Sequence, residues 1–202
     1  MNQRKQASPR RSDTRDRILW TAHDLFYRDG VRATGVDALI AGAGVTKVTF
    51  YRRFPSKDDL VLAYLDYRHD LWMSWFLDAL TRARDAQSED DRQRAPLAPV
   101  VQAMREWFAE PTFRGCGFIN VMAELGEAAP QALAKCAAHK TEMRAAIEAL
   151  VAPAPDERAI AEAAAIAVDG AIVQAQQGPD HVGPALAGLE ALLSALTAAR
   201  PA

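Results

Sequence analysis

The first sixty residues carry apolar side chains at the spacing of short amphipathic helices. The first stripe follows i, i+4, i+7 and i+8 spacing, which gives one apolar helix face, and Gly30 ends this helix. The stripe consists of Ile18, Ala22, Leu25 and Phe26. A second, shorter helix is expected over residues 36–41, with Thr34 at the position of its cap.

Gly44 lies where the chain turns tightly from this second helix into a third, because glycine adds no side chain that would clash there. Thr46 follows at the N-cap of the third helix, where its hydroxyl can accept from an unpaired backbone amide. Three apolar residues can face inward together, namely Val45, Phe50 and Phe54. The polar side chains then point outward, and they are Lys47, Thr49, Tyr51, Arg52 and Arg53. Such a surface suits a DNA major groove lined by phosphates.

Only helices are predicted for the rest of the chain. Ser56 and Asp59 form a capping-box pattern that opens a long helix to about Arg84, and the polar stretch 85–94 is expected to be a loop. Further helices are expected over residues 96–109, 116–126, 130–150, 156–177 and 184–200. The fold class is therefore all-α, with about nine helices. We expect a flexible tail at 1–12, a helix-turn-helix domain at 13–60 and a helical regulatory and dimerisation domain at 61–202.

Charge is divided unequally along the chain and strengthens the DNA-binding interpretation. The net charge of −2 hides 12 Lys+Arg against 5 Asp+Glu in residues 1–57, and 12 against 21 in residues 58–202. The first part is thus at +7 and the second at −9. A basic segment that coincides with a helix-turn-helix is typical of a protein that approaches DNA with one end.

Several other classes of protein are disfavoured by what the sequence lacks. No export signal and no uninterrupted apolar stretch of membrane-spanning length occurs, so we expect a cytoplasmic protein without membrane contact. The two cysteines and four histidines show no metal-ligand spacing, and no nucleophile motif or phosphate loop is present. We therefore expect no metal, no cofactor and no catalysis; a helical enzyme is a remote alternative.

Residues 14–71 resemble the N-terminal domain of the TetR family of transcriptional regulators. The matching segments are Leu25-Phe26, Gly30, AGVTKVTFY at 43–51 and FPSKDDL at 54–60. Ile40 departs from the pattern, since most members have alanine there, and this concerns the angle between the two helices. The resemblance implies a homodimer whose two recognition helices enter successive major grooves of an inverted-repeat operator, with a small molecule controlling binding.

The resemblance also assigns roles on the third helix. Thr46 and Tyr51 are expected to contact phosphates, and Lys47, Thr49 and Arg52 to reach base edges. Arg53 is either a phosphate contact or an ion-pair partner. Lys57, in the first turn of the fourth helix, opposes the helix dipole unless a phosphate binds there. Thr34 completes the set of candidate DNA-binding residues.

A small-molecule pocket is expected among the aromatic and methionine side chains of the central helices. The candidates are Trp72, Trp75, Phe76, Met104, Trp107, Phe118, Asn120, Met122, Asp169 and Gln174. The alternative is a filled core without an effector, because such side chains also pack helices together. Asp169 needs a partner or a ligand if it is buried. Cys116 is either a quiet buried thiol or a redox sensor near a helix start.

Two C-terminal helices are expected to form the dimer interface. Their candidate residues are Ile166, Ile172, Val173, Leu186, Leu189, Leu193 and Leu196, of which the leucines follow the 3-4-3 spacing of a helix bundle. The alternative is that these residues fill the core of a single chain. A repressor is favoured, and an activator remains the alternative. The sequence predicts neither the effector nor the operator sequence.

Overall fold

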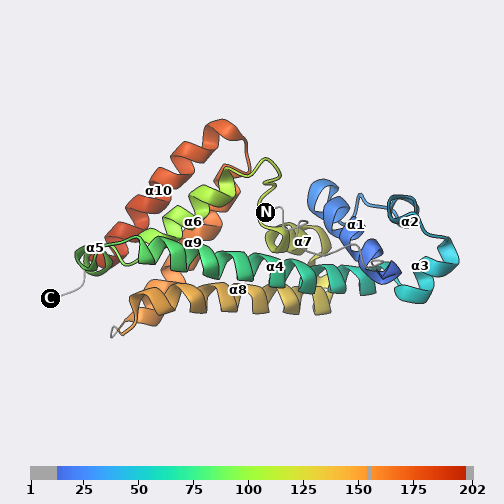
Figure 1. The fold of residues 1–202 in the computed structure, drawn as a ribbon, viewed down its shortest axis with the longest axis horizontal. Coiled ribbons are helices and arrows are strands. Elements are labelled where there is room, and N and C mark those ends of the chain that lie inside the picture. Colours follow the sequence, from blue (N-terminus) through green and yellow to red (C-terminus); the bar gives the residue numbers. More distant parts are fainter. Residues whose placement is uncertain (1–12, 154–155, 199–202) are drawn as a thin grey trace. The chain divides into compact units, whose positions relative to one another are not determined.

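The computed structural model describes residues 13–153 and 156–198, and every regular element in these ranges is helical (Figure 1). The N-terminal helices are α1 (Thr14–Asp29), α2 (Val36–Ala43), α3 (Lys47–Arg53) and α4 (Lys57–Asp85). They are followed by α5 (Glu89–Arg94), α6 (Ala98–Phe108), α7 (Gly117–Leu125) and a single 3-10 turn, Gly126–Ala128. The last three are α8 (Pro130–Val151), α9 (Glu157–Ala175) and α10 (Pro179–Ala198). The all-α prediction is confirmed; the predicted tail 1–12 lies outside the described residues.

The chain folds into two compact units. The first comprises Met1–Leu71 and Gly117–Ala137, and thus contains α1 to α3, the start of α4, α7 and the start of α8. The second comprises Trp72–Cys116 and Ala138–Ala202, with the remainder of α4 and α8 and all of α5, α6, α9 and α10. Helix α4 is therefore one continuous helix of 29 residues that contributes to both units.

The first unit is organised around α1. This helix buries the predicted residues Ile18, Ala22 and Phe26, together with Leu19. Helix α2 approaches α1 closely at Gly42, where an added Cβ would lie 2.8 Å from Thr21 Cγ2. A larger residue at this position would push the two helices apart, so the glycine permits the contact.

In the second unit, α10 packs against α9 and α6. It buries one face, formed by Ala185, Leu186, Leu189, Leu193 and Thr197. By length and composition alone α10 could also cross a membrane. In this unit its buried face lies against α9 and α6.

Two predictions about the helices are wrong. The stretch 85–94 contains α5, which Ser88 caps: its hydroxyl accepts from the Asp91 amide at 3.1 Å and donates to the Asp91 carboxylate at 2.6 Å. Helix α10 starts at Pro179 and not at Pro184, which lies inside it. Proline suits the first helical position, and Pro184 removes only one backbone hydrogen bond from the early turns.

Candidate nucleic-acid interface

A tight turn at Gly44 separates α2 from α3, as predicted. Gly44 adopts the left-handed conformation, with φ 62° and ψ 43°, which a side chain would disfavour. Its amide donates to the carbonyls of Ile40 and Ala41, and the Val45 amide donates to Ile40 O at 3.2 Å. These bonds satisfy the end of α2 and fix the direction in which α3 begins.

Helix α3 is held in place at both of its ends. The Thr46 hydroxyl accepts from the Thr49 amide at 3.2 Å, which confirms the predicted N-cap. Phe50 and Phe54 are buried as predicted, whereas Val45 is half-buried. At the other end, Arg53 forms an ion pair of 3.4 Å with Asp13 at the start of α1.

The outer face of α3 is open to solvent. Lys47, Tyr51 and Arg52 are exposed, and within the described residues none of the three forms a side-chain hydrogen bond or ion pair. Thr49 is half-buried and its hydroxyl lies 2.9 Å from that of Thr46, so it is less accessible than predicted. Arg53 forms an ion pair with Asp13, which is one of the two roles expected for it.

Lys57 and Glu124 fasten the turn between α1 and α2 from two sides. Lys57 Nζ donates to the carbonyl of Val31 at 2.6 Å, and the Glu124 carboxylate on α7 accepts from the Arg32 amide at 2.7 Å. Gly30 has a φ of 90°, and a Cβ there would lie 3.0 Å from Glu124 Oε1. Lys57 thus has a structural contact that the sequence did not predict, and its ammonium keeps two further donors.

Two predictions about Thr34, as a helix cap and as a DNA contact, are wrong. The N-cap of α2 is Gly35, so Thr34 is not the cap. Thr34 is 4 % exposed, and its hydroxyl donates to the carbonyl of Gly30 at 2.7 Å. A buried hydroxyl with this partner holds the turn together, so we do not retain Thr34 as a DNA contact.

Val48 is a surface residue that the sequence interpretation left unassigned. It lies on α3 between Lys47 and Thr49 and is 69 % exposed. An apolar side chain on a recognition helix can contact the methyl group of thymine. Val48 lies two residues before the buried Phe50, which places it on the opposite face of the helix, and this spacing was the available signal.

The predicted ligand-binding residues of the second unit form a filled aromatic core. Trp72, Phe76, Met104 and Trp107 are buried, and Trp75 is half-buried. Trp72 stacks on Phe76 with ring centroids 4.6 Å apart and meets Trp107 edge-on at 5.4 Å. The ring of His139 lies 5.1 Å from that of Trp72. Trp72 Nε1 is nevertheless a buried donor without an acceptor among the described residues.

Not all of the predicted pocket residues join this core. Gln174 is exposed. Asp169 is half-buried and forms an ion pair with Lys140, which is the partner that a buried carboxylate needs. Phe118, Asn120 and Met122 belong to α7 in the first unit, where Phe118 is buried and the other two are half-buried. Cys116 is a free thiol and only 4 % exposed, which limits access by an oxidant.

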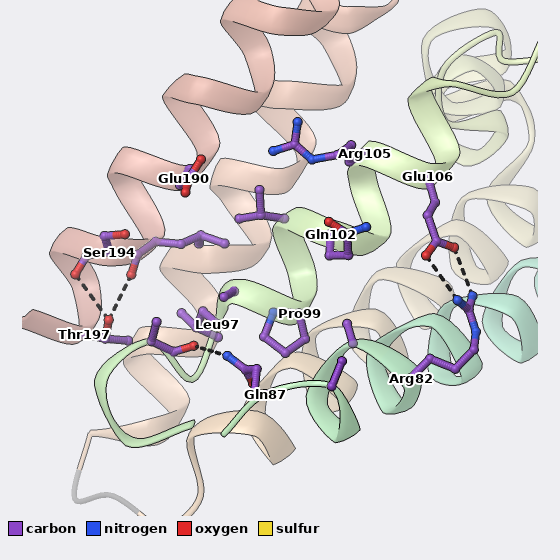
Figure 2. Close-up of a pocket in the computed structure, with 16 residues that line it drawn as sticks. Arg82, Gln87, Leu97, Pro99, Gln102, Arg105, Glu106, Glu190, Ser194 and Thr197 are labelled. Carbon is purple, nitrogen blue, oxygen red and sulfur yellow. Dashed lines mark hydrogen bonds and ion pairs between the residues drawn. The ribbon is translucent and has the colours of Figure 1, made fainter. Parts of the chain in front are cut away.

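A cavity of about 560 Å³ lies elsewhere in the second unit, between the end of α4, α6 and α10 (Figure 2). Alanine, Leu97 and Pro99 side chains supply its apolar surface. On one wall Arg82 donates two hydrogen bonds to Glu106, at 2.9 and 3.1 Å. Glu106, and then Asp78, raise the pKa of Arg82, which remains charged. Ser194 and Thr197 of α10 form the opposite wall.

The predicted dimer residues fall into two groups. Ile172, Leu186, Leu189 and Leu193 are buried within the single chain, so their assignment to an interface is corrected: they pack α9 and α10 together. Ile166 and Val173 are exposed on α9, at 67 % and 48 %, and Leu196 is half-buried. Leu192, which was not a candidate, is 56 % exposed on α10.

Taken together, a capped recognition helix, a glycine turn and a basic outer face define a DNA-binding protein of the helix-turn-helix class. Residues 18–64 match the family described as bacterial regulatory proteins, tetR family. The chain belongs to the TetR family of transcriptional regulators, because a likeness above 30 % identity extends over nearly the whole chain.

Two solved structures and one curated protein illustrate this relationship. A putative TetR transcriptional regulator from Streptomyces avermitilis is 31 % identical, with a TM-score of 0.71 over 87 % of this chain and 95 % of that one. A TetR-family regulator from Streptomyces coelicolor is 29 % identical, with a TM-score of 0.75 over 91 % and 96 %. The transcriptional regulator TtgR of Pseudomonas putida is 28 % identical over 61 % of this chain, and the chain spans 60 % of its length.

The position of Thr34 leads to a stability prediction. Thr34→Val keeps the shape of the side chain and removes the donor to Gly30 O, so the free energy of unfolding should fall by about 1 kcal/mol. Urea denaturation measures this change. Thr112→Val, at an exposed position, is the control and should change stability little. Equal stability of the Thr34 variant and the unaltered protein would show that the hydroxyl does not hold the turn.

Proposed function

We propose that the protein is a transcriptional repressor that binds a palindromic DNA operator as a homodimer and is released by a small hydrophobic effector. The observation that carries this proposal is the outer face of α3, where a capped and anchored helix holds Lys47, Tyr51 and Arg52 outward. Within the described residues these three side chains form no hydrogen bond or ion pair. A regulator of this kind acts in the cytoplasm. Residues 13–60 read DNA and residues 61–202 serve regulation and dimerisation.

Side chains on and beside α3 divide the work of recognition in this proposal. Lys47, Thr49 and Arg52 meet base edges, and Thr46 and Tyr51 contact phosphates. Arg53 remains bound to Asp13 and orients the helix end. Lys57 contacts a phosphate with the donors that Val31 leaves unused, and the start of α4 favours an anion at that place.

Replacing Arg52 and Lys57 should have different consequences. Arg52→Ala should relax specificity at one base pair by about 1–3 kcal/mol, because an arginine at the groove pairs with guanine. Lys57→Ala should weaken binding to operator and random DNA alike and reduce the salt slope by about 1. The measurement is fluorescence anisotropy on a duplex selected from a random DNA pool by the unaltered protein. Equal losses on both DNAs for both variants would refute the division of roles.

The exposed apolar side chains of α9 and α10 support a dimer. Ile166, Val173 and Leu192 leave a large part of their surface in water in the single chain. Gly170 and Gly188, on the same two helices, are exposed, and an added Cβ at either would meet no atom within 4 Å. Small residues beside exposed apolar ones permit a second pair of helices to approach closely and bury this surface.

Charged substitutions on this surface should separate the subunits. The double variant Ile166→Asp, Leu192→Asp places two carboxylates in the proposed interface, so sedimentation at micromolar concentration should show a monomer. Leu77→Asp is the matched control, since Leu77 is 49 % exposed on α4 and outside the proposed interface. A monomeric unaltered protein, or a double variant that stays dimeric, would contradict the proposal.

Trp72 marks the place we propose for the effector. Its buried Nε1 has no acceptor in residues 13–153 and 156–198, and a buried unpaired donor costs about 1–3 kcal/mol. An aromatic effector with a hydrogen-bond acceptor would satisfy this donor while it lies among Trp75, Phe76 and Trp107. Trp72 and Phe76 belong to α4, which continues to Lys57 beside the turn after α1. Binding there would therefore favour a different position of α4, as a shift between two populations.

A thermal-shift screen with planar aromatic carbonyl compounds tests the effector site. Compounds that bind the native state should raise its melting temperature, and Trp72→Phe should reduce this shift because it removes the donor. Ser194→Trp, which fills the cavity between α6 and α10, should leave the shift unchanged. The opposite pattern would place the effector in the cavity, and the absence of any shift would favour an effector-independent regulator with a filled core.

A further inference from the structure

Arg68 is a buried cation that has no carboxylate partner within ion-pair distance among the described residues. It lies on α4 in the first unit and is 4 % exposed. Its guanidinium lies over the ring of Tyr27 on α1, 3.9 Å from the ring centroid. Its Nη1 lies 3.3 Å from Nε2 of His23, also on α1. An isolated buried charge is costly, so these two contacts are what makes Arg68 tolerable in this position.

The contact with Arg68 fixes the protonation state of His23. A guanidinium only donates hydrogen bonds, so Nε2 of His23 must present its lone pair. The proton of the neutral ring is then on Nδ1, which lies 3.2 Å from Oδ1 of Asp24. Asp24, His23 and Arg68 thus form a chain of hydrogen bonds, in which a neutral imidazole joins a carboxylate to a guanidinium. A doubly protonated imidazole could not accept from Arg68.

The side chains around His23 belong to α1 and α4, and the start of α7 lies close to them. Tyr27 on α1 and Tyr64 and Tyr67 on α4 face the ring at centroid distances of 6.3, 6.0 and 5.3 Å. On α7, a Cβ at Gly117 would lie 2.9 Å from Tyr64 Oη and 3.8 Å from Arg68 Nε, so that helix start closes over the pair. Two charged groups contact the ring: Asp24, which favours protonation, and Arg68, which opposes it.

We propose that Arg68 and His23 are a positioning pair that holds α1 on α4, and that protonation of His23 releases the pair and weakens DNA binding in acid. This inference rests on the proposed function, since it concerns how the DNA-reading unit is held. Neither residue contacts DNA. The sign follows from burial: Arg68 is buried and opposes protonation of the ring, whereas the Asp24 side chain is 52 % exposed, so water screens its opposite effect. The neutral ring is therefore the form that the folded state stabilises. The contribution is therefore present at neutral pH and is lost as the pH falls through the range in which histidine titrates.

The test compares DNA affinity at about pH 8 and about pH 5.5 for the full chain, with a duplex selected from random DNA by the unaltered protein at the higher pH. The unaltered protein should lose roughly tenfold in affinity, because protonation removes a hydrogen bond to a charged group. His23→Gln should bind well and lose much less, because its amide oxygen accepts from Arg68 and its amide nitrogen donates to Asp24 at every pH. His181→Gln, exposed on α10, is the control and should keep the full pH dependence.

Two further measurements separate this proposal from a general structural role and from the proposed function. Nitrogen NMR of the imidazole should show His23 protonated on Nδ1 and bare on Nε2 at about pH 8, a signature that packing alone does not require. The free energy of unfolding should fall in acid for the unaltered protein and less for His23→Gln, whether or not the protein binds DNA. The opposite tautomer, or equal pH dependence of stability and affinity in His23→Gln and the unaltered protein, would overturn the proposal. Loss of DNA binding alone, with the NMR and stability results intact, would overturn only the proposed function.

Discussion

The reading face of the molecule depends on a helix too short to exist by itself. Isolated helices below about 12–15 residues are marginal in water, and α3 has seven residues. Its conformation therefore comes from its two ends and from its one buried side: the Thr46 cap, the fully buried Phe50, and the ion pair between Arg53 and Asp13. Because Asp13 is the N-cap of α1, and α3 packs against both α1 and α2, the orientation of the exposed side chains depends on all three helices.

Local chemistry explains what the sequence predicted correctly and where it was misread. The caps at Thr46 and Ser56 were predicted because a hydroxyl before a helix finds an unpaired amide one turn later. Ser88 and Asp91 repeat the pattern of Ser56 and Asp59, but α5 has no buried residue, so a criterion based on apolar spacing missed it. Thr34 shows the converse error, because its hydroxyl bonds to the carbonyl of Gly30 in place of a helix start.

Burial was harder to predict, because spacing shows which residues share a face but not what covers that face. The 3-4-3 leucines of α10 do form one stripe, and the structure uses Leu189 and Leu193 to join α10 to the rest of its own unit. Leu192, one residue away, stays exposed. On α9, similarly, Ile172 is buried and its neighbour Val173 is exposed. A helix with apolar residues on several faces needs more than one covering surface, and in the single chain Val173 and Leu192 remain exposed.

The aromatic core around Trp72 shows why a ligand site is the least predictable part of such a protein. Dense ring contacts stabilise the closed core, while the unpaired Nε1 of Trp72 lowers that gain by about 1–3 kcal/mol. These two opposing contributions are of similar size, so residue identities alone did not predict whether the rings pack together or leave room for a ligand. Trp72 belongs to the same continuous helix as Lys57, whose ammonium holds the carbonyl of Val31. In the proposed mechanism, a ligand that separates these rings would change DNA binding only as far as its affinities for two positions of α4 differ. The stability of the packed core would then limit the strength of regulation.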